Sequence, residues 1–63
     1  MIIVFLPAYN EAPGIRQLLE RIERALHGLE HSIVVVDDGS SDNTGAIVRE
    51  AAQEWPITLV SHP

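Results

Sequence analysis

The stretch Val34-Val35-Val36-Asp37-Asp38-Gly39-Ser40-Ser41-Asp42 joins a run of β-branched residues to a cluster of acids, hydroxyls and one glycine. β-Branched residues favour strands, and a continuous apolar run is typical of a strand covered on both faces of a parallel sheet. Ligands of open α/β sheets bind beyond the carboxyl ends of such strands. The stretch therefore predicts a buried strand that delivers Asp37 and Asp38 to a ligand site.

The apolar pattern outside this stretch predicts that strands and helices alternate. Short apolar runs rich in β-branched residues indicate strands at about residues 2–6, 32–37 and 57–61. Apolar residues spaced i, i+3, i+4 and i+7 indicate amphipathic helices at about residues 13–27 and 42–54. Because crossovers between parallel strands are right-handed, we expect a three-layer, Rossmann-like β-α-β-α-β fold. Its second strand should lie between the other two.

The size and charge of the chain limit its possible partners. Residues 1–63 are enough for one small domain. Four arginines and no lysine stand against nine acids, and the net charge of −5 argues against a nucleic-acid partner, which needs clustered cations. The chain has no cysteine, so it can form neither a disulfide nor a Cys-based zinc site.

Several side chains have expected structural roles. We expect Asp42 to cap the second helix and Trp55 to lie in the core. His27 and His31 should be solvent-exposed, at the end of the sheet away from the ligand site. Without a neighbouring strand, residues 2–6 would form an exposed apolar edge, which favours self-association.

The carboxyl ends of the three strands should bring together residues 7–11, 37–42 and 61–63. These segments offer an aromatic ring (Tyr9), acids, amides and hydroxyls. A diphosphate would meet several negative charges there, whereas carboxylates are good acceptors for a nucleobase N–H or for ribose hydroxyls. The first strand is followed by no glycine-rich phosphate loop. We therefore expect recognition of base and ribose rather than direct binding of phosphate.

Two motifs resemble those of a known family. The sequence Pro7-Ala8-Tyr9-Asn10-Glu11 after an apolar strand resembles the P-x-Y-N-E opening of family-2 glycosyltransferases with the GT-A fold. Residues 35–44 resemble the V-V-D-D-G-S-x-D-x-T segment of the same family. The resemblance runs from residue 2 to about residue 60, and within the family it is strongest to polyprenyl-phosphate mannosyl- or glucosyltransferases. It implies that residues 1–63 are part of a nucleotide-sugar-binding domain.

The resemblance implies a set of residues around the nucleoside of the sugar donor: Pro7, Ala8, Tyr9, Glu11, Asp37 and Asp38. Of these, the first three would line the base pocket, and Glu11 would lie beside the ribose or brace its loop. One aspartate would bind the edge of uracil or guanine. We favour Asp37 for this contact, with Asp38 also close.

The same resemblance implies an inverting transferase that moves a sugar from a UDP- or GDP-sugar to an acceptor such as a polyprenyl phosphate or a glycan. Mg²⁺ or Mn²⁺ would be bound by a D-x-D motif, and both this motif and the catalytic base normally follow later in the chain. Neither occurs in these residues, so we expect an N-terminal fragment without catalytic or metal-binding residues, inactive alone. The full-length enzyme would act in the cytoplasm or at the cytoplasmic face of a membrane.

Three alternatives compete with this interpretation. A phosphorelay receiver domain has a similar acidic strand end, but its acid pair usually follows the first strand. A dinucleotide-binding oxidoreductase holds ribose with an acid after the second strand, but the glycine fingerprint is missing here. A non-catalytic module could simply bind another chain through its open sheet edge.

Overall fold

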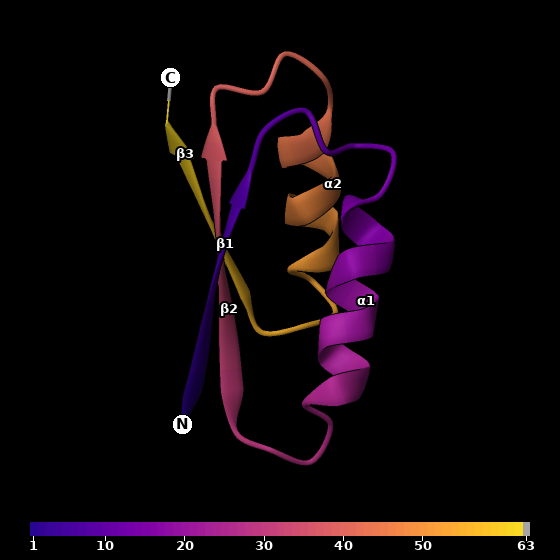
Figure 1. Cartoon of the computed structure of the whole chain (residues 1–63), viewed down its shortest axis with the longest axis vertical. Helices are drawn as coiled ribbons and strands as arrows, with labels where there is room; N and C mark the ends of the chain where they lie inside the picture. The colour runs from indigo at the N-terminus through magenta and orange to yellow at the C-terminus, as the bar shows by residue number, and fades with distance from the viewer. Residues whose placement is uncertain (63) are drawn as a thin grey trace.

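The computed structural model describes residues 1–62 as five elements in the predicted order (Figure 1). These are β1 (Ile2–Ala8), α1 (Ile15–Ala25), β2 (His31–Asp38), α2 (Thr44–Ala51) and β3 (Ile57–His62). None of the helices in these residues is long and apolar enough to span a membrane. The β-α-β-α-β fold is confirmed.

The three strands form one parallel sheet in the order β1-β2-β3, so β2 is central as predicted. Ala8 of β1 is the register partner of Asp37, and on the other side Asp37 and Asp38 are the partners of Ser61 and His62. The carboxyl ends of all three strands therefore lie at the same edge of the sheet.

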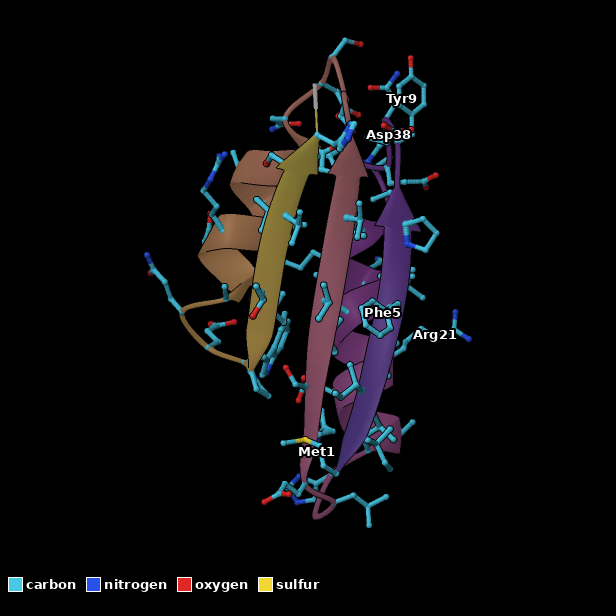
Figure 2. The ribbon with its side chains drawn as sticks, turned by 90° about the vertical axis from the view of Figure 1, so that its left-hand side faces the viewer. Met1, Phe5, Tyr9, Arg21 and Asp38 are labelled. Carbon is cyan, nitrogen blue, oxygen red and sulfur yellow. The ribbon has the colours of Figure 1, made fainter. Side chains whose placement is uncertain are left out.

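Both helices pack on the same face of the sheet (Figure 1). The strand order advances in one direction, and two right-handed crossovers in one direction place both helices on one side. The described residues thus supply two of the three expected layers. On the other face, Ile3, Phe5 and Val60 are exposed, Phe5 to 70% (Figure 2).

The core lies between this helical layer and the sheet. Alternate residues of β2 point to the helices, and Ile33 and Val35 are fully buried there. The remaining members of the buried apolar cluster come from the other four elements: Ala8, Ile15, Leu19, Val48, Ala51 and Ile57. Trp55 lies at the margin of this core rather than inside it, half-buried, with the guanidinium of Arg16 5.1 Å from its ring centroid.

The helices are shorter than predicted at both ends. The segment before α1 forms a turn in which the Glu11 carbonyl accepts the N–H groups of Gly14 (3.0 Å) and Ile15 (2.8 Å). After Ala25 the helical bonds give way to a turn, and Gly28 then takes a left-handed φ of 84°. The turn that follows α2 leads into Pro56, which cannot extend a helix.

The expected exposure of His31 is wrong. His31 is the first residue of β2, and its side chain is only 10% exposed because it packs against Glu23 of α1. Nε2 lies 2.9 Å from Oε2 of Glu23, and Nδ1 lies 2.7 Å from the Leu29 carbonyl. The hydrogen bond to the Leu29 carbonyl, followed by the one to Glu23, raises the pKa of His31 above its ordinary value. His27, in contrast, is exposed as expected.

Candidate functional site

Two loops meet at the carboxyl edge of the sheet, one after β1 (residues 9–14) and one after β2 (residues 39–43) (Figure 1). Because β1 and β2 are neighbours in register up to Ala8 and Asp37, their loops leave the sheet together. The predicted convergence of residues 7–11 and 37–42 is therefore confirmed. The end of β3 reaches the same edge through Ser61 and His62, and Pro63 lies outside the described residues.

Cross-loop hydrogen bonds tie these two loops together. Three consecutive backbone N–H groups of the first loop donate to side-chain oxygens that follow β2: Asn10 to Ser40 Oγ (2.9 Å), Glu11 to Thr44 Oγ1 (2.9 Å) and Ala12 to Asp42 Oδ2 (3.2 Å). In the opposite direction, Oδ1 of Asn10 accepts the N–H groups of Ser41 (2.8 Å) and Asp42 (3.4 Å). We call this network, centred on Asn10, Ser40, Asp42 and Thr44, the loop clasp.

Asn10 has an unusual backbone conformation. Its φ is 51°, and within residues 1–62 it is the one non-glycine residue with a positive φ. Asparagine tolerates this left-handed region better than most residues because its short amide can hydrogen-bond locally. The conformation turns the chain back toward the second loop directly after Tyr9.

Asp42 has a structural role, but the expected cap is wrong by position, because the N-cap residue of α2 is Asn43. Asp42 precedes Asn43, and its Oδ1 accepts the Thr44 hydroxyl and the Thr44 N–H (3.0 Å) at the start of α2. The hydrogen bond from the Thr44 hydroxyl lowers the pKa of Asp42, and the N–H groups of Thr44 and Ala12 add to this effect. Its carboxylate is thus occupied inside the protein and is not a free ligand group.

Asp37 and Asp38 occupy different environments, although they are neighbours in sequence. Asp37 points to the helical side and is 8% exposed. Its Oδ1 accepts both the N–H (3.1 Å) and the hydroxyl of Ser40. Its Oδ2 faces the first turn of α2, where a Cβ added to Gly45 would lie 3.2 Å away. Asp37 therefore stabilises the second loop from within.

Asp38 points to the opposite side, with 74% of its side chain exposed. Its Oδ1 lies 3.7 Å from Nδ1 of His62, its register partner on β3. Tyr9, 59% exposed, and Asp38 each come directly after the last register pair of β1 and β2, and they lie at the same end of the molecule (Figure 2). An aromatic ring and an accessible carboxylate are thus presented from neighbouring strands.

The other candidate residues have mixed placements. Pro7 is exposed on the same side of the sheet as Phe5, whereas Ala8 is buried against the helices. The side chain of Glu11 is exposed, while its backbone takes part in the loop clasp. The structure thus brings Pro7, Tyr9, Glu11 and Asp38 to the surface at one edge. Their contacts with a nucleoside stay a prediction.

The loop clasp also limits which ligand group can bind here. The N–H groups of residues 10–12 donate across the clasp, and those of residues 40–42 and 44 donate to Asp37, Asn10 and Asp42. An anion at a helix start needs unpaired backbone N–H groups. These loop donors are therefore engaged within the protein, and an anion could reach them only by breaking bonds of the loop clasp.

The Mg²⁺ or Mn²⁺ expected for the family does not fit these residues. Within residues 1–62 no group of three or more His, Asp or Glu side chains is placed to hold a metal ion. Asp38 and His62 form a single pair at this edge. We therefore derive no chemical step through a metal.

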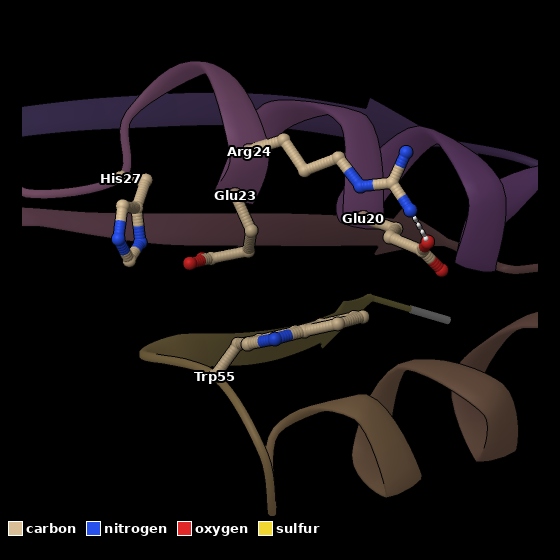
Figure 3. Close-up of a pocket in the computed structure, with 5 residues that line it drawn as sticks. All are labelled: Glu20, Glu23, Arg24, His27 and Trp55. Carbon is tan, nitrogen blue, oxygen red and sulfur yellow. Dashed lines mark hydrogen bonds and ion pairs between the residues drawn. The ribbon is translucent and has the colours of Figure 1, made fainter.

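A pocket of about 560 Å³ lies elsewhere, along the C-terminal half of α1 (Figure 3). It is lined by residues that all lie away from the strand ends: Glu20, Glu23, Arg24, His27 and Trp55. In Figure 3 the Trp55 ring lies below this row of α1 side chains, and Arg24 is bound to Glu20 (2.7 Å). None of the predicted site residues contributes to this pocket.

Sequence reasoning missed the positions that connect the two loops, namely Asn10, Ser40 and Thr44. A usable signal exists, because Ser, Thr, Asn and Asp readily hydrogen-bond to nearby backbone groups. Both loops carry such residues. Their pairing across the loops, however, depends on the register of β1 and β2, which the sequence does not reveal directly.

A parallel sheet with helical crossovers and polar loops at its carboxyl edge defines a Rossmann-like fold. The family described as Glycosyl transferase family 2 matches residues 3–63. The chain belongs to this glycosyltransferase family, which confirms the resemblance of its two motifs.

The similar proteins are named as sugar transferases of dolichol phosphate or undecaprenyl phosphate. A dolichol-phosphate mannosyltransferase from Pyrococcus furiosus is 40% identical over 57 residues, which is 90% of this chain and 16% of the relative. An undecaprenyl-phosphate 4-deoxy-4-formamido-L-arabinose transferase from Edwardsiella ictaluri is 48% identical over 52 residues, 79% of this chain and 16% of the relative. A transferase of the same name from Pseudomonas savastanoi pv. phaseolicola is 41% identical over 60 residues, 92% of this chain and 18% of the relative. The chain spans about a sixth of the length of these curated relatives.

Proposed function

We propose that this chain forms the donor-nucleoside site of a glycosyltransferase that moves a sugar from a UDP- or GDP-sugar to a polyprenyl phosphate. The observation that carries the proposal is that the exposed Asp38 carboxylate and the exposed Tyr9 ring both follow the last register pair of the neighbouring strands β1 and β2. The family membership supports the transferase class. The names of the relatives, which mention dolichol phosphate and undecaprenyl phosphate, support a polyprenyl phosphate as the acceptor.

Asp38 would accept hydrogen bonds from the donor edge of the base. Uracil offers one imide N–H, and guanine offers a ring N–H and an adjacent amino group that can meet both oxygens of one carboxylate. Tyr9 would stack on the base face, and Glu11 would lie near the ribose hydroxyls. In this arrangement Asp37 stabilises the loop after β2. We therefore assign the hydrogen bond to the base edge, which we expected for Asp37 from the sequence, to Asp38 instead.

The chemical step would take place on groups outside these residues. An acceptor oxygen would attack the anomeric carbon, and the nucleoside diphosphate would leave with the electron pair of the broken bond. This chain would contribute binding and orientation of the donor, through the exposed Tyr9, Glu11 and Asp38 side chains at the carboxyl edge of the sheet.

Calorimetric titration of Asp38→Asn with UDP and with GDP tests the proposal. Loss of a charge-assisted hydrogen bond of about 1.5–3 kcal/mol weakens binding by about 10- to 100-fold. Removing a negative charge by itself favours an anionic ligand, so weaker binding cannot be a charge effect. The control Glu50→Gln removes an exposed acid near the C-terminal end of α2 and should leave both affinities unchanged. Unchanged affinity of Asp38→Asn for both nucleotides would falsify the proposal.

Self-association is a second proposal, supported by a different observation. Within residues 1–62, β1 is an edge strand, and Ile2, Ile3 and Phe5 are exposed along it. Unpaired backbone groups beside exposed apolar side chains favour pairing with another chain. Sedimentation of this chain over a range of concentrations tests it, and a monomer at every concentration contradicts it.

A further inference from the structure

Among residues 1–62, the hydrogen bonds of the Asn10 side chain are all accepted by its Oδ1. Its Oδ1 receives the N–H groups of Ser41 (2.8 Å) and Asp42 (3.4 Å) and the Ser41 hydroxyl (3.3 Å). All three donors belong to the loop after β2, about thirty positions away in the chain. One oxygen therefore holds the second loop against the first.

The backbone of Asn10 is also connected to Asp37, through the Ser40 hydroxyl. Its N–H donates to Ser40 Oγ (2.9 Å), and the Ser40 hydroxyl donates to Oδ1 of Asp37. Asn10 directly follows Tyr9, and Asp37 directly precedes Asp38. The relay thus joins the two positions that flank the exposed aromatic ring and the exposed carboxylate.

We propose that Asn10 is a positioning residue that holds Tyr9 and Asp38 in the relative arrangement a nucleoside needs, an inference that rests on the proposed function. Asn10 does so through Oδ1, by restraining residues 41–42, and through its left-handed backbone, which turns the first loop toward Ser40. Its amide nitrogen has no part in this role. A contact of Asn10 with the ligand is not required.

Two variants separate positioning from direct contact. Asn10→Gly deletes the acceptor, and glycine adopts the positive φ without strain. Asn10→Asp keeps an oxygen in the same place that can accept all three donors, but it loses the amide donor. The second variant therefore preserves the positioning function and removes any hydrogen bond that the amide could donate to a ligand.

The experiment measures two quantities in the full-length protein. The first is the hydrogen-exchange protection of the Ser41 and Asp42 amides. The second is the affinity for uridine and guanosine, followed by NMR titration in about 1 M salt, where the Debye length is about 3 Å and the added charge of Asn10→Asp is screened. The nucleosides are neutral, so a change in net charge does not itself alter their binding.

We expect Asn10→Gly to lose protection at both amides and to bind the nucleosides about 10-fold more weakly, because the loops must then be ordered on binding. Asn10→Asp should retain the protection and bind within about 3-fold of the unmodified protein. If Asn10→Asp keeps its amides protected but binds as weakly as Asn10→Gly, the amide contacts the ligand and the positioning role is overturned. If the unmodified protein binds neither nucleoside, the proposed function fails, and the exchange data alone then report on the loop clasp.

Discussion

Replacement of Thr44 by valine tests the energetic role of the loop clasp. Thr44 is fully buried at the start of α2, where its hydroxyl donates to Asp42 and accepts the Glu11 N–H (2.9 Å). Valine has nearly the same shape and is also β-branched, so Thr44→Val leaves no cavity. It removes the hydroxyl alone, and the Glu11 N–H loses its partner.

The expected loss follows from this orphaned donor. A buried donor left without a partner costs about 1–3 kcal/mol. Because the Glu11 contact is only part-buried, we take the lower part of this range, about 1–2 kcal/mol. A domain of 63 residues has a total stability of roughly 3–9 kcal/mol, so this loss is a substantial fraction.

Urea unfolding followed by the fluorescence of Trp55, the single tryptophan of these residues, measures the change. With a slope of about 1 kcal/mol per molar urea, the midpoint of Thr44→Val should fall by about 1–2 M. The control Thr44→Ser keeps the hydroxyl and removes one buried methyl group, at a cost of about 1 kcal/mol. The two variants should therefore lose comparable stability but differ at the Glu11 amide, which exchanges faster in Thr44→Val alone.

Whether Thr44→Val lowers or raises the stability decides whether the loop clasp stabilises the fold. Exchange of a hydroxyl for a methyl group in a fully buried position raises stability if apolar burial dominates there. A midpoint of Thr44→Val at or above that of the unmodified protein, with the Glu11 amide still protected, would refute the energetic role of the clasp.

Two further predictions concern the rest of the fold. The folded-state pKa of His31 is raised, so the stabilisation it gives is fully present below its unfolded value of about 6.5 and is lost as the pH rises through the folded value. In an NMR titration, Glu23→Gln should lower this pKa without restoring the ordinary value, because the Leu29 carbonyl still accepts from Nδ1; an identical pKa in both proteins contradicts the pairing. Leu19→Ala should destabilise the fold by about 2–5 kcal/mol, since Leu19 is fully buried. Leu18→Ala, at a partly exposed neighbour, should cost clearly less in the same thermal unfolding assay, and equal losses would contradict the assigned face of α1.

The strand pattern could be predicted because each strand is a short apolar run with β-branched residues, and right-handed crossovers then leave few topologies. The helix ends could not be predicted as well. Pro13 suits a first helical position. However, the Glu11 carbonyl accepts hydrogen bonds from the N–H groups of Gly14 and Ile15 in a turn, and α1 begins only at Ile15. Such local competition between turn and helix depends on the geometry of the loop that precedes the helix.

The candidate site was predicted at the level of segments rather than of individual side chains. Tyr9 and the acid pair do lie at one edge, because parallel strands end together. The different environments of Asp37 and Asp38 follow from strand alternation, since Asp37 shares a face with Ile33 and Val35. The expectation for His31 failed because its burial depends on Glu23, which lies eight residues earlier on a helix that folds back over it.

The alternation at the end of β2 has a consequence for how this segment tolerates changes in length. Deletion of one residue between His31 and Val36 would move every later residue of the strand to the opposite side of the sheet. The acid that now holds Ser40 would then face solvent, and Asp38 would be placed against Gly45 and the first turn of α2. Substitutions within β2 alter one side chain at a time, whereas deletion of a single residue would exchange the environments of both aspartates together.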